Sequence, residues 1–183
     1  MSIRAKWVAR VGEGRLVKLD FLIPGPSEKR TVLMSAEINR LVSGPWEDTI
    51  MGDRCARLRA NLENIVSGAK LTVCWDPFKG RPHHQIGRLS PPQDFMFDIR
   101  CGEEPALRVT FHFAEKDVLV AYLCSPRSLP VSWLHRLPLG EGSSREWQGI
   151  IMESNALWGE LFPGSRPHSG NHIDDLLSNA VLR

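Results

Sequence analysis

The amino-acid sequence predicts an α+β fold in which helices pack on one face of a twisted antiparallel β-sheet, extended by an N-terminal hairpin and a C-terminal helix. Apolar and polar residues alternate across residues 95–113, which is the period of strands with two different faces. Apolar residues recur at helical spacing over residues 54–66 and 143–162. The 183 residues, 42% of them hydrophobic, suffice for one domain with a real core. We place that domain at residues 1–162 and treat residues 163–183 as a linker and a short tail helix.

The first half of the chain is predicted to contain a hairpin, two helices and a strand. Residues 3–23 alternate at the strand period on either side of a Gly-Glu-Gly turn, which indicates the hairpin. Residues 31–42 and 54–66 carry apolar residues at helical spacing, and a glycine stop signal follows each of them. A short strand is expected at residues 71–75.

The second half is predicted to form a three-stranded meander followed by a long helix. Alternation assigns strands to residues 95–99 and 107–113, and residues 118–124 are apolar on both sides, as in a strand buried on two faces. An ordered connection is expected over residues 125–142. A capping-box pattern then opens the helix at residues 143–162.

Residues 76–94 form a long connection that contains four Pro and two Gly and shows no period. Connections of this length in a compact domain often carry function. The segment has a modest excess of positive charge and two adjacent histidines. A solvated loop without function explains the same composition equally well.

Composition and motifs exclude several classes of protein. The net charge is +2, so nucleic-acid contact requires locally clustered charge. No apolar run approaches the roughly 18 residues of a membrane helix, and the N-terminus lacks the apolar stretch of a signal peptide, so we expect a cytoplasmic protein with no membrane partner. The four Cys are scattered and the adjacent His83 and His84 cannot easily face one ion, so we expect no metal and no cofactor. Gly-rich phosphate loops, Gly-x-Ser-x-Gly and HExxH motifs are absent.

The strands around residue 100 place a polar constellation on one side of the sheet. If Arg100 pairs with Arg108, the pleat brings these two side chains to the same face as Asp98, Thr110 and His112. Two neighbouring guanidinium groups repel each other unless Asp98, solvent or a bound anion compensates, and a phosphate fits this description. The simpler alternative is the polar alternation of any sheet with one wet face.

The stretch from the helix at 54–66 to the last strand resembles the RelE/ParE-type toxin superfamily, including its HigB and phage-protein relatives. The match covers about residues 54–127. In those chains a helix ending in Gly precedes a loop, a strand closing in a "LyElR" phrase, a short loop with Gly, a "yRvlyf" phrase and a last apolar strand. The corresponding phrases here are Phe97-Asp98-Ile99-Arg100, Gly102 and Leu107-Arg108-Val109-Thr110-Phe111.

The resemblance implies a basic concave face that holds mRNA in the ribosomal A site, and metal-free endoribonuclease chemistry in which the RNA's own 2′-hydroxyl attacks the adjacent phosphate. Arg108 matches the phosphate-binding Arg of the family, and Arg100 matches the Arg of the preceding strand. No motif fixes the general acid or base; we expect His112, or one of His83 and His84, because imidazole titrates near neutral pH. The partners would be RNA or the ribosome and a neutralising antitoxin, and we also allow for a homodimer. The expected RNA-binding residues are Lys79, Arg81, His83, His84, Arg88 and Arg127.

The last strand departs from the family pattern. RNA-cleaving members usually end this strand with a basic or aromatic catalytic group, whereas here only Tyr122 and Arg127 are nearby. A second hypothesis is therefore a non-catalytic module that binds nucleic acid or protein, for example of phage or mobile-element origin. The two hypotheses differ in whether the purified protein cuts the RNA that it binds.

Overall fold

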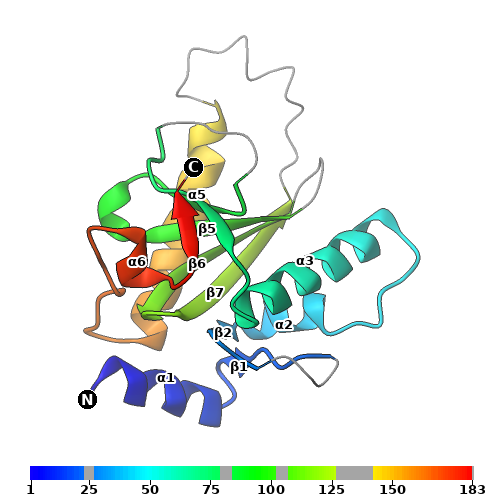
Figure 1. The fold of residues 1–183 in the computed structure, drawn as a ribbon, viewed down its shortest axis with the longest axis horizontal. Coiled ribbons are helices and arrows are strands. Elements are labelled where there is room, and N and C mark those ends of the chain that lie inside the picture. The colour runs from blue at the N-terminus through cyan, green and yellow to red at the C-terminus, as the bar shows by residue number, and fades with distance from the viewer. Residues whose placement is uncertain (23–26, 79–83, 102–106, 127–141, 183) are drawn as a thin grey trace.

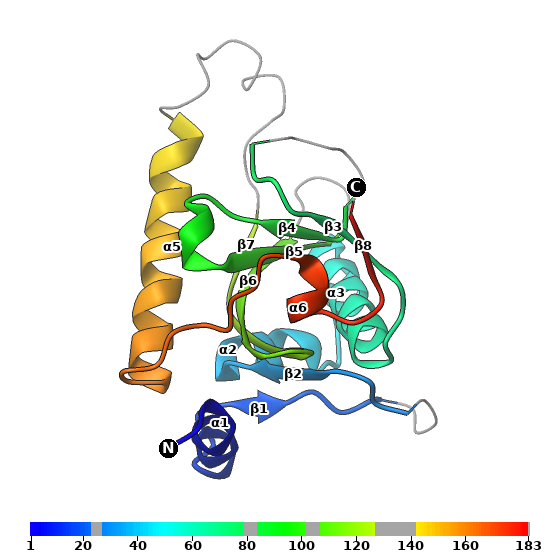
Figure 2. The same ribbon diagram turned by 60° about the vertical axis from the view of Figure 1, so that its left-hand side comes forward.

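The computed structural model describes residues 1–22, 27–78, 84–101, 107–126 and 142–182. Figures 1 and 2 show a central mixed β-sheet with helices on both of its faces. The elements along the chain are α1 (Ile3–Gly12), β1 (Val17–Lys18), β2 (Thr31–Met34), α2 (Ala36–Val42), α3 (Ile50–Val66), β3 (Leu71–Cys74), β4 (Ile86–Arg88), the 3-10 helix η1 (Pro92–Asp94), β5 (Met96–Cys101), β6 (Leu107–Glu115), β7 (Val118–Pro126), α5 (Gly142–Leu161), α6 (Ile173–Leu176) and β8 (Ala180–Leu182). The α+β class predicted from the sequence is confirmed.

The sheet has eight strands among the described residues, in the order β1-β2-β7-β6-β5-β4-β3-β8. The predicted meander is confirmed, because β4, β5, β6 and β7 pair antiparallel in sequence. Three other pairs are parallel, namely β2 with β7, β3 with β4 and β3 with β8. The predicted antiparallel sheet is therefore wrong outside the meander, because the strands at both of its sides form parallel pairs.

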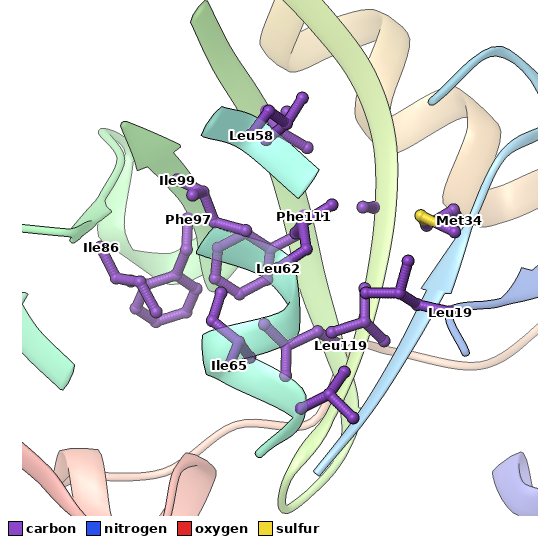
Figure 3. Packing of buried hydrophobic residues seen from close by; sticks show 14 of the residues in the cluster. Leu19, Met34, Leu58, Leu62, Ile65, Ile86, Phe97, Ile99, Phe111 and Leu119 are labelled. Atoms are coloured by element: carbon purple, nitrogen blue, oxygen red, sulfur yellow. The ribbon is translucent and has the colours of Figure 1, made fainter. Parts of the chain in front are cut away.

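Helices cover both faces of the sheet rather than one. On one face α2, α3 and α6 enclose the larger core, where Leu58, Leu62 and Ile65 of α3 face Phe97 and Phe111 (Figure 3). On the other face α5 and α1 pack on β6, β7 and β2 through a second cluster around Trp158, Phe162 and Tyr122. Figure 2 shows α5 along one side of the sheet and α3 on the other. The prediction of helices on a single face is wrong because it could not place α1 and α5.

The N-terminal hairpin predicted over residues 3–23 is also wrong, because residues 3–12 form α1. The Ser2 side chain accepts a hydrogen bond from the Ala5 amide and caps this helix. Ile3, Trp7 and Val11 recur every four residues and pack partly against the second cluster. The same three residues also fit a strand period, so the alternation could not distinguish the two structures.

Two further segments differ from their predictions. Thr31–Met34 is the strand β2, buried between β1 and β7, and only the residues after the Ser35 cap are helical. Residues 173–182 are not an appendage. Leu176 and Leu177 are wholly buried in the larger core, and β8 pairs with β3 as the edge of the sheet.

Candidate functional site

The hairpin of β5 and β6 brings two arginines opposite each other, as the sequence predicted. Arg100 is the pairing partner of Arg108, and Asp98 is the partner of Thr110 two positions along. In an antiparallel pair directly opposed side chains point to the same face. Phe97, Ile99, Val109 and Phe111 point into the larger core on the opposite face.

Asp98 links the two arginines. Its Oδ2 atom lies 3.2 Å from Nε of Arg100 and 3.3 Å from Nη1 of Arg108. The Asp98 side chain is fully buried, whereas that of Arg100 is 36% exposed and that of Arg108 is 12% exposed. The buried carboxylate therefore compensates the repulsion between two guanidinium groups that reach outward to different extents. We call Arg100, Arg108 and Asp98 the arginine seat.

Gly87 of β4 lies directly beside the arginine seat. It pairs with Asp98, and a Cβ atom at this position would lie 2.6 Å from Oδ1 of Asp98, 2.9 Å from Nε2 of His84 and 3.3 Å from Nη2 of Arg100. The side chains of Asp98 and Arg100 from β5 and of His84 from the segment before β4 thus converge at Gly87, which has no side chain. His84 is buried and immediately precedes this part of the chain. The structure therefore brings one of the predicted histidines close to the predicted arginines.

Helix α5 covers the other end of the same sheet face. The hydroxyls of Thr110 and Ser154 lie 2.8 Å apart, and both residues are fully buried. Next to them the His112 ring packs against Tyr122 and Trp158, with centroid distances of 5.6 and 5.4 Å. The polar face of β5 and β6 is thus divided into a covered end under α5 and a partly exposed end at the arginine seat.

The structure contradicts the catalytic role predicted for His112. Its side chain has no exposed surface, and burial lowers the pKa of the imidazole to about 4, although the backbone of Asp94 offsets part of this effect. A ring with no exposed surface that is neutral near pH 7 cannot contact an RNA phosphate, whereas His84 keeps 8% of its surface exposed. Tyr122 is excluded for the same reason, because it is fully buried and burial raises the pKa of its phenol.

Arg88, predicted to bind RNA, is half-buried and makes several contacts within the fold. Its guanidinium carbon lies between the rings of Trp75 and Phe95, 4.4 and 4.6 Å from their centroids. Its Nη2 atom donates to the Pro92 carbonyl at 2.6 Å, and burial lowers the pKa of the guanidinium. These contacts stabilise the segment around η1, and Arg88 shares the sheet face of its strand partner Phe97, opposite to the arginine seat.

Four predicted residues cannot be placed. Lys79, Arg81, His83 and Arg127 lie outside the described residues. The sequence analysis missed Gly87 and Ser154. Gly87 lies in a segment interpreted as a loop, and its three-residue strand Ile86-Gly87-Arg88 shows no apolar alternation that could have indicated β4.

Other features of the described residues add no competing site. No group of three or more His, Cys, Asp or Glu side chains is arranged to hold a metal ion there. None of the described helices combines the length and the apolar character needed to cross a membrane. An open hollow between Phe95, Lys116, His168 and Asp175 is lined by both charges. The arginine seat is therefore the candidate functional site.

Comparisons of this chain with models of known protein families, with curated proteins and with solved structures found no match.

Proposed function

We propose that this chain is a RelE-like toxin, a metal-independent endoribonuclease that acts on mRNA in the cytoplasm, at the ribosome or in free RNA, and is neutralised by an antitoxin. Arg100 and Arg108 would bind the phosphate at the scissile bond, and His84 would transfer a proton. The observation that carries the proposal is the pair of guanidinium groups held together by Asp98 at a partly exposed end of the sheet.

The chemistry of RNA cleavage by the 2′-hydroxyl matches this set of side chains. Attack on the phosphate develops negative charge on its oxygens, and preorganised guanidinium groups stabilise that charge without a metal ion. A proton must leave the 2′-hydroxyl and another must reach the departing oxygen, which is the work of an imidazole such as His84. The described histidines other than His84 are the buried His112, His168 in the lining of the hollow near Lys116, and His172 at the start of α6.

The expected order of helix, connection and three-strand meander is present between residues 50 and 126, which supports the RelE-like interpretation. The additional helix α5 covers Thr110 and His112, whereas the Arg100 side chain is 36% exposed. An RNA strand would therefore approach the arginine seat from the exposed side of Arg100.

Growth arrest on induced expression tests this function. Arg100→Gln and Arg108→Gln should each abolish or strongly weaken the arrest, because each removes one of the two phosphate-binding groups. Arg40→Gln is the matched control, since it removes one positive charge from an exposed position on α2. Circular dichroism of the purified variants verifies that they fold. Wild-type protein that does not slow growth, or arginine variants as toxic as the wild type, would contradict the proposal.

The alternative is a binding module without catalysis. The specific observation in its favour is that His112 of β6 and Tyr122 of β7 are fully buried. Neither side chain is therefore available as a catalytic acid or base. A binding module would show salt-dependent affinity for RNA and leave the RNA uncut, and Arg100→Gln would weaken the affinity and its dependence on salt.

A further inference from the structure

We infer that Asp98 positions His84 for proton transfer, because its Oδ1 atom accepts a hydrogen bond from Nε2 of His84 and so leaves Nδ1 as the ring nitrogen that takes a proton from the RNA. This role deepens the proposed function, and its proton-transfer step rests on that function. The hydrogen bond between the two side chains does not rest on it and can be tested separately. Asp98 is thus a positioning residue that acts through His84.

One oxygen of the Asp98 carboxylate holds the arginines and the other does not. Oδ2 lies 3.2 Å from Nε of Arg100 and 3.3 Å from Nη1 of Arg108. Oδ1 is buried and accepts no hydrogen bond from the part of the chain that the structure describes. Burying a carboxylate oxygen is costly unless a donor satisfies it. Oδ1 therefore requires a donor on the side of the carboxylate that faces Gly87.

The imidazole of His84 stands beside Oδ1 at Gly87. Oδ1 of Asp98 and Nε2 of His84 lie 2.6 and 2.9 Å from the point where a Gly87 side chain would begin, so their separation cannot exceed the sum of these two distances. Because Gly87 has no side chain, the ring can rotate across it and bring Nε2 within hydrogen-bond distance of Oδ1.

Arg100 offers a second nearby donor, because its Nη2 atom lies 3.3 Å from the same point. Arg100 already donates its Nε to Oδ2, however, and its side chain is 36% exposed. Its Nη2 can therefore turn outward to a phosphate. The His84 ring is only 8% exposed and stays beside the carboxylate, so its Nε2 is the donor that Oδ1 retains when RNA binds.

The carboxylate determines which ring nitrogen carries the proton. A carboxylate oxygen and an unprotonated Nε2 both only accept hydrogen bonds, so they repel each other unless Nε2 carries the hydrogen. A neutral imidazole has a single N–H, and its lone pair then lies on Nδ1. During cleavage Nδ1 takes the proton of the 2′-hydroxyl while the O2′–P bond forms and the P–O5′ bond breaks, and water protonates the departing O5′. Asp98 stabilises the positive charge that His84 gains, as the carboxylate of a Ser-His-Asp triad does for its imidazole.

Asp98→Asn should invert this arrangement. The two arginines can only donate, so the oxygen of the new amide stays on their side and its NH₂ group faces Nε2 of His84. Nε2 must then accept, and the single ring proton moves to Nδ1, the nitrogen that the reaction needs unprotonated. The equivalent change in a Ser-His-Asp triad produces the wrong tautomer and lowers turnover by about 10⁴-fold.

The tautomer is measured by NMR. Long-range proton–nitrogen correlation spectra of the full-length protein distinguish a protonated ring nitrogen from an unprotonated one, and His84→Gln identifies the His84 signals by their loss. At about pH 9, where imidazoles ordinarily hold a single proton, the wild-type ring should carry it on Nε2 and the Asp98→Asn ring on Nδ1. Asp174→Asn makes the same change at an exposed position of α6 and should leave the proton on Nε2.

Cleavage and binding of RNA give a second readout. Asp98→Asn should slow the cleavage of an RNA oligonucleotide at least about 100-fold, the smaller end of what general acid–base catalysis contributes. It should bind the uncleavable 2′-O-methyl form of the same oligonucleotide at least as tightly as the wild type, because it removes the negative charge between the arginines. Asp174→Asn should change neither property. If Asp98 only held the fold together, cleavage and binding would weaken together.

The outcomes separate the positioning role from the proposed function. A wild-type His84 ring with its proton on Nδ1, or an Asp98→Asn ring that keeps it on Nε2, overturns the role of Asp98 whether or not RNA is cut. A folded Asp98→Asn variant that cuts RNA as fast as the wild type, or binds it more weakly, also overturns that role. If Asp98→Asn does not fold, the wild-type spectrum decides. If the proton is on Nε2 but the wild-type protein cuts no RNA, the proposed function and the proton-transfer step fail and the hydrogen bond stands.

Discussion

Burial of His112 predicts that the folded protein loses stability as the pH falls from about 6.5 to about 4. The ring lies under α5 between Tyr122 and Trp158, with no exposed surface, and burial lowers its pKa to about 4 from the ordinary value of 6.5. Between these two values the unfolded chain binds a proton at this position and the folded chain does not. Stability from this group is therefore complete above about pH 6.5 and is lost as the pH falls toward 4.

The magnitude follows from the same two values. An interval from 6.5 to about 4, at about 1.36 kcal/mol for each pH unit, corresponds to about 3 kcal/mol of unfolding free energy. This is a large fraction of the roughly 5–15 kcal/mol that stabilises an ordinary domain. The effect should accordingly be visible in equilibrium denaturation with urea.

The assay compares the wild type with His112→Gln, which cannot titrate in this range. The unfolding free energy of the wild type should fall by about 3 kcal/mol more than that of His112→Gln between pH 7 and pH 4. Arg40→Gln is the control, because Arg40 is exposed on α2 and an arginine does not titrate in this range, and it should follow the wild type. Parallel pH profiles of the wild type and His112→Gln would refute the buried neutral state of His112.

Two further predictions concern the packing beside the seat and at the end of the chain. Gly87→Ala should destabilise the fold by about 1–3 kcal/mol and weaken phosphate binding, because the new Cβ would lie 2.6 Å from Oδ1 of Asp98. Gly149→Ala in α5 meets no atom within 4 Å and should be neutral or stabilising, so equal effects of the two changes in thermal unfolding would contradict the geometry. Leu177→Ala should cost about 2–5 kcal/mol in urea denaturation, since Leu177 is fully buried in the larger core, whereas Leu182→Ala, at a residue 53% exposed, should cost less than about 0.5 kcal/mol. Equal costs would show that the tail is not part of the core.

The sequence predicted the pairing of the arginines because a strand has a strict period of two. Once Phe97, Ile99, Val109 and Phe111 are assigned to the core, Arg100 and Arg108 can only point to the opposite face. The same reasoning failed at Ile3, Trp7 and Val11, which satisfy the periods of both a strand and a helix. A local sequence pattern therefore determines which face a side chain occupies only where the pattern fits a single secondary-structure period.

The alternation along a strand could not predict which other elements of the chain cover its polar face. Thr110, His112 and Arg108 all occupy polar positions in the same alternation along β6. Ser154 and Trp158, more than forty residues later in the chain, nevertheless cover Thr110 and His112. The convergence of His84, Asp98 and Arg100 over Gly87 likewise depends on β4 pairing with β5, within a segment whose prolines indicate a loop. Both features arise from tertiary packing between segments that carry no local signal for each other.

The most direct test of metal-free cleavage at the arginine seat uses purified protein and a defined RNA oligonucleotide in the presence of EDTA. We expect the RNA to be cut to a product ending in a 2′,3′-cyclic phosphate. One 2′-deoxy nucleotide at the cleaved position should stop the reaction, and Arg100→Gln should abolish it while Arg40→Gln does not. RNA that stays intact, or that is cut equally well by Arg100→Gln, would contradict metal-free cleavage at the arginine seat.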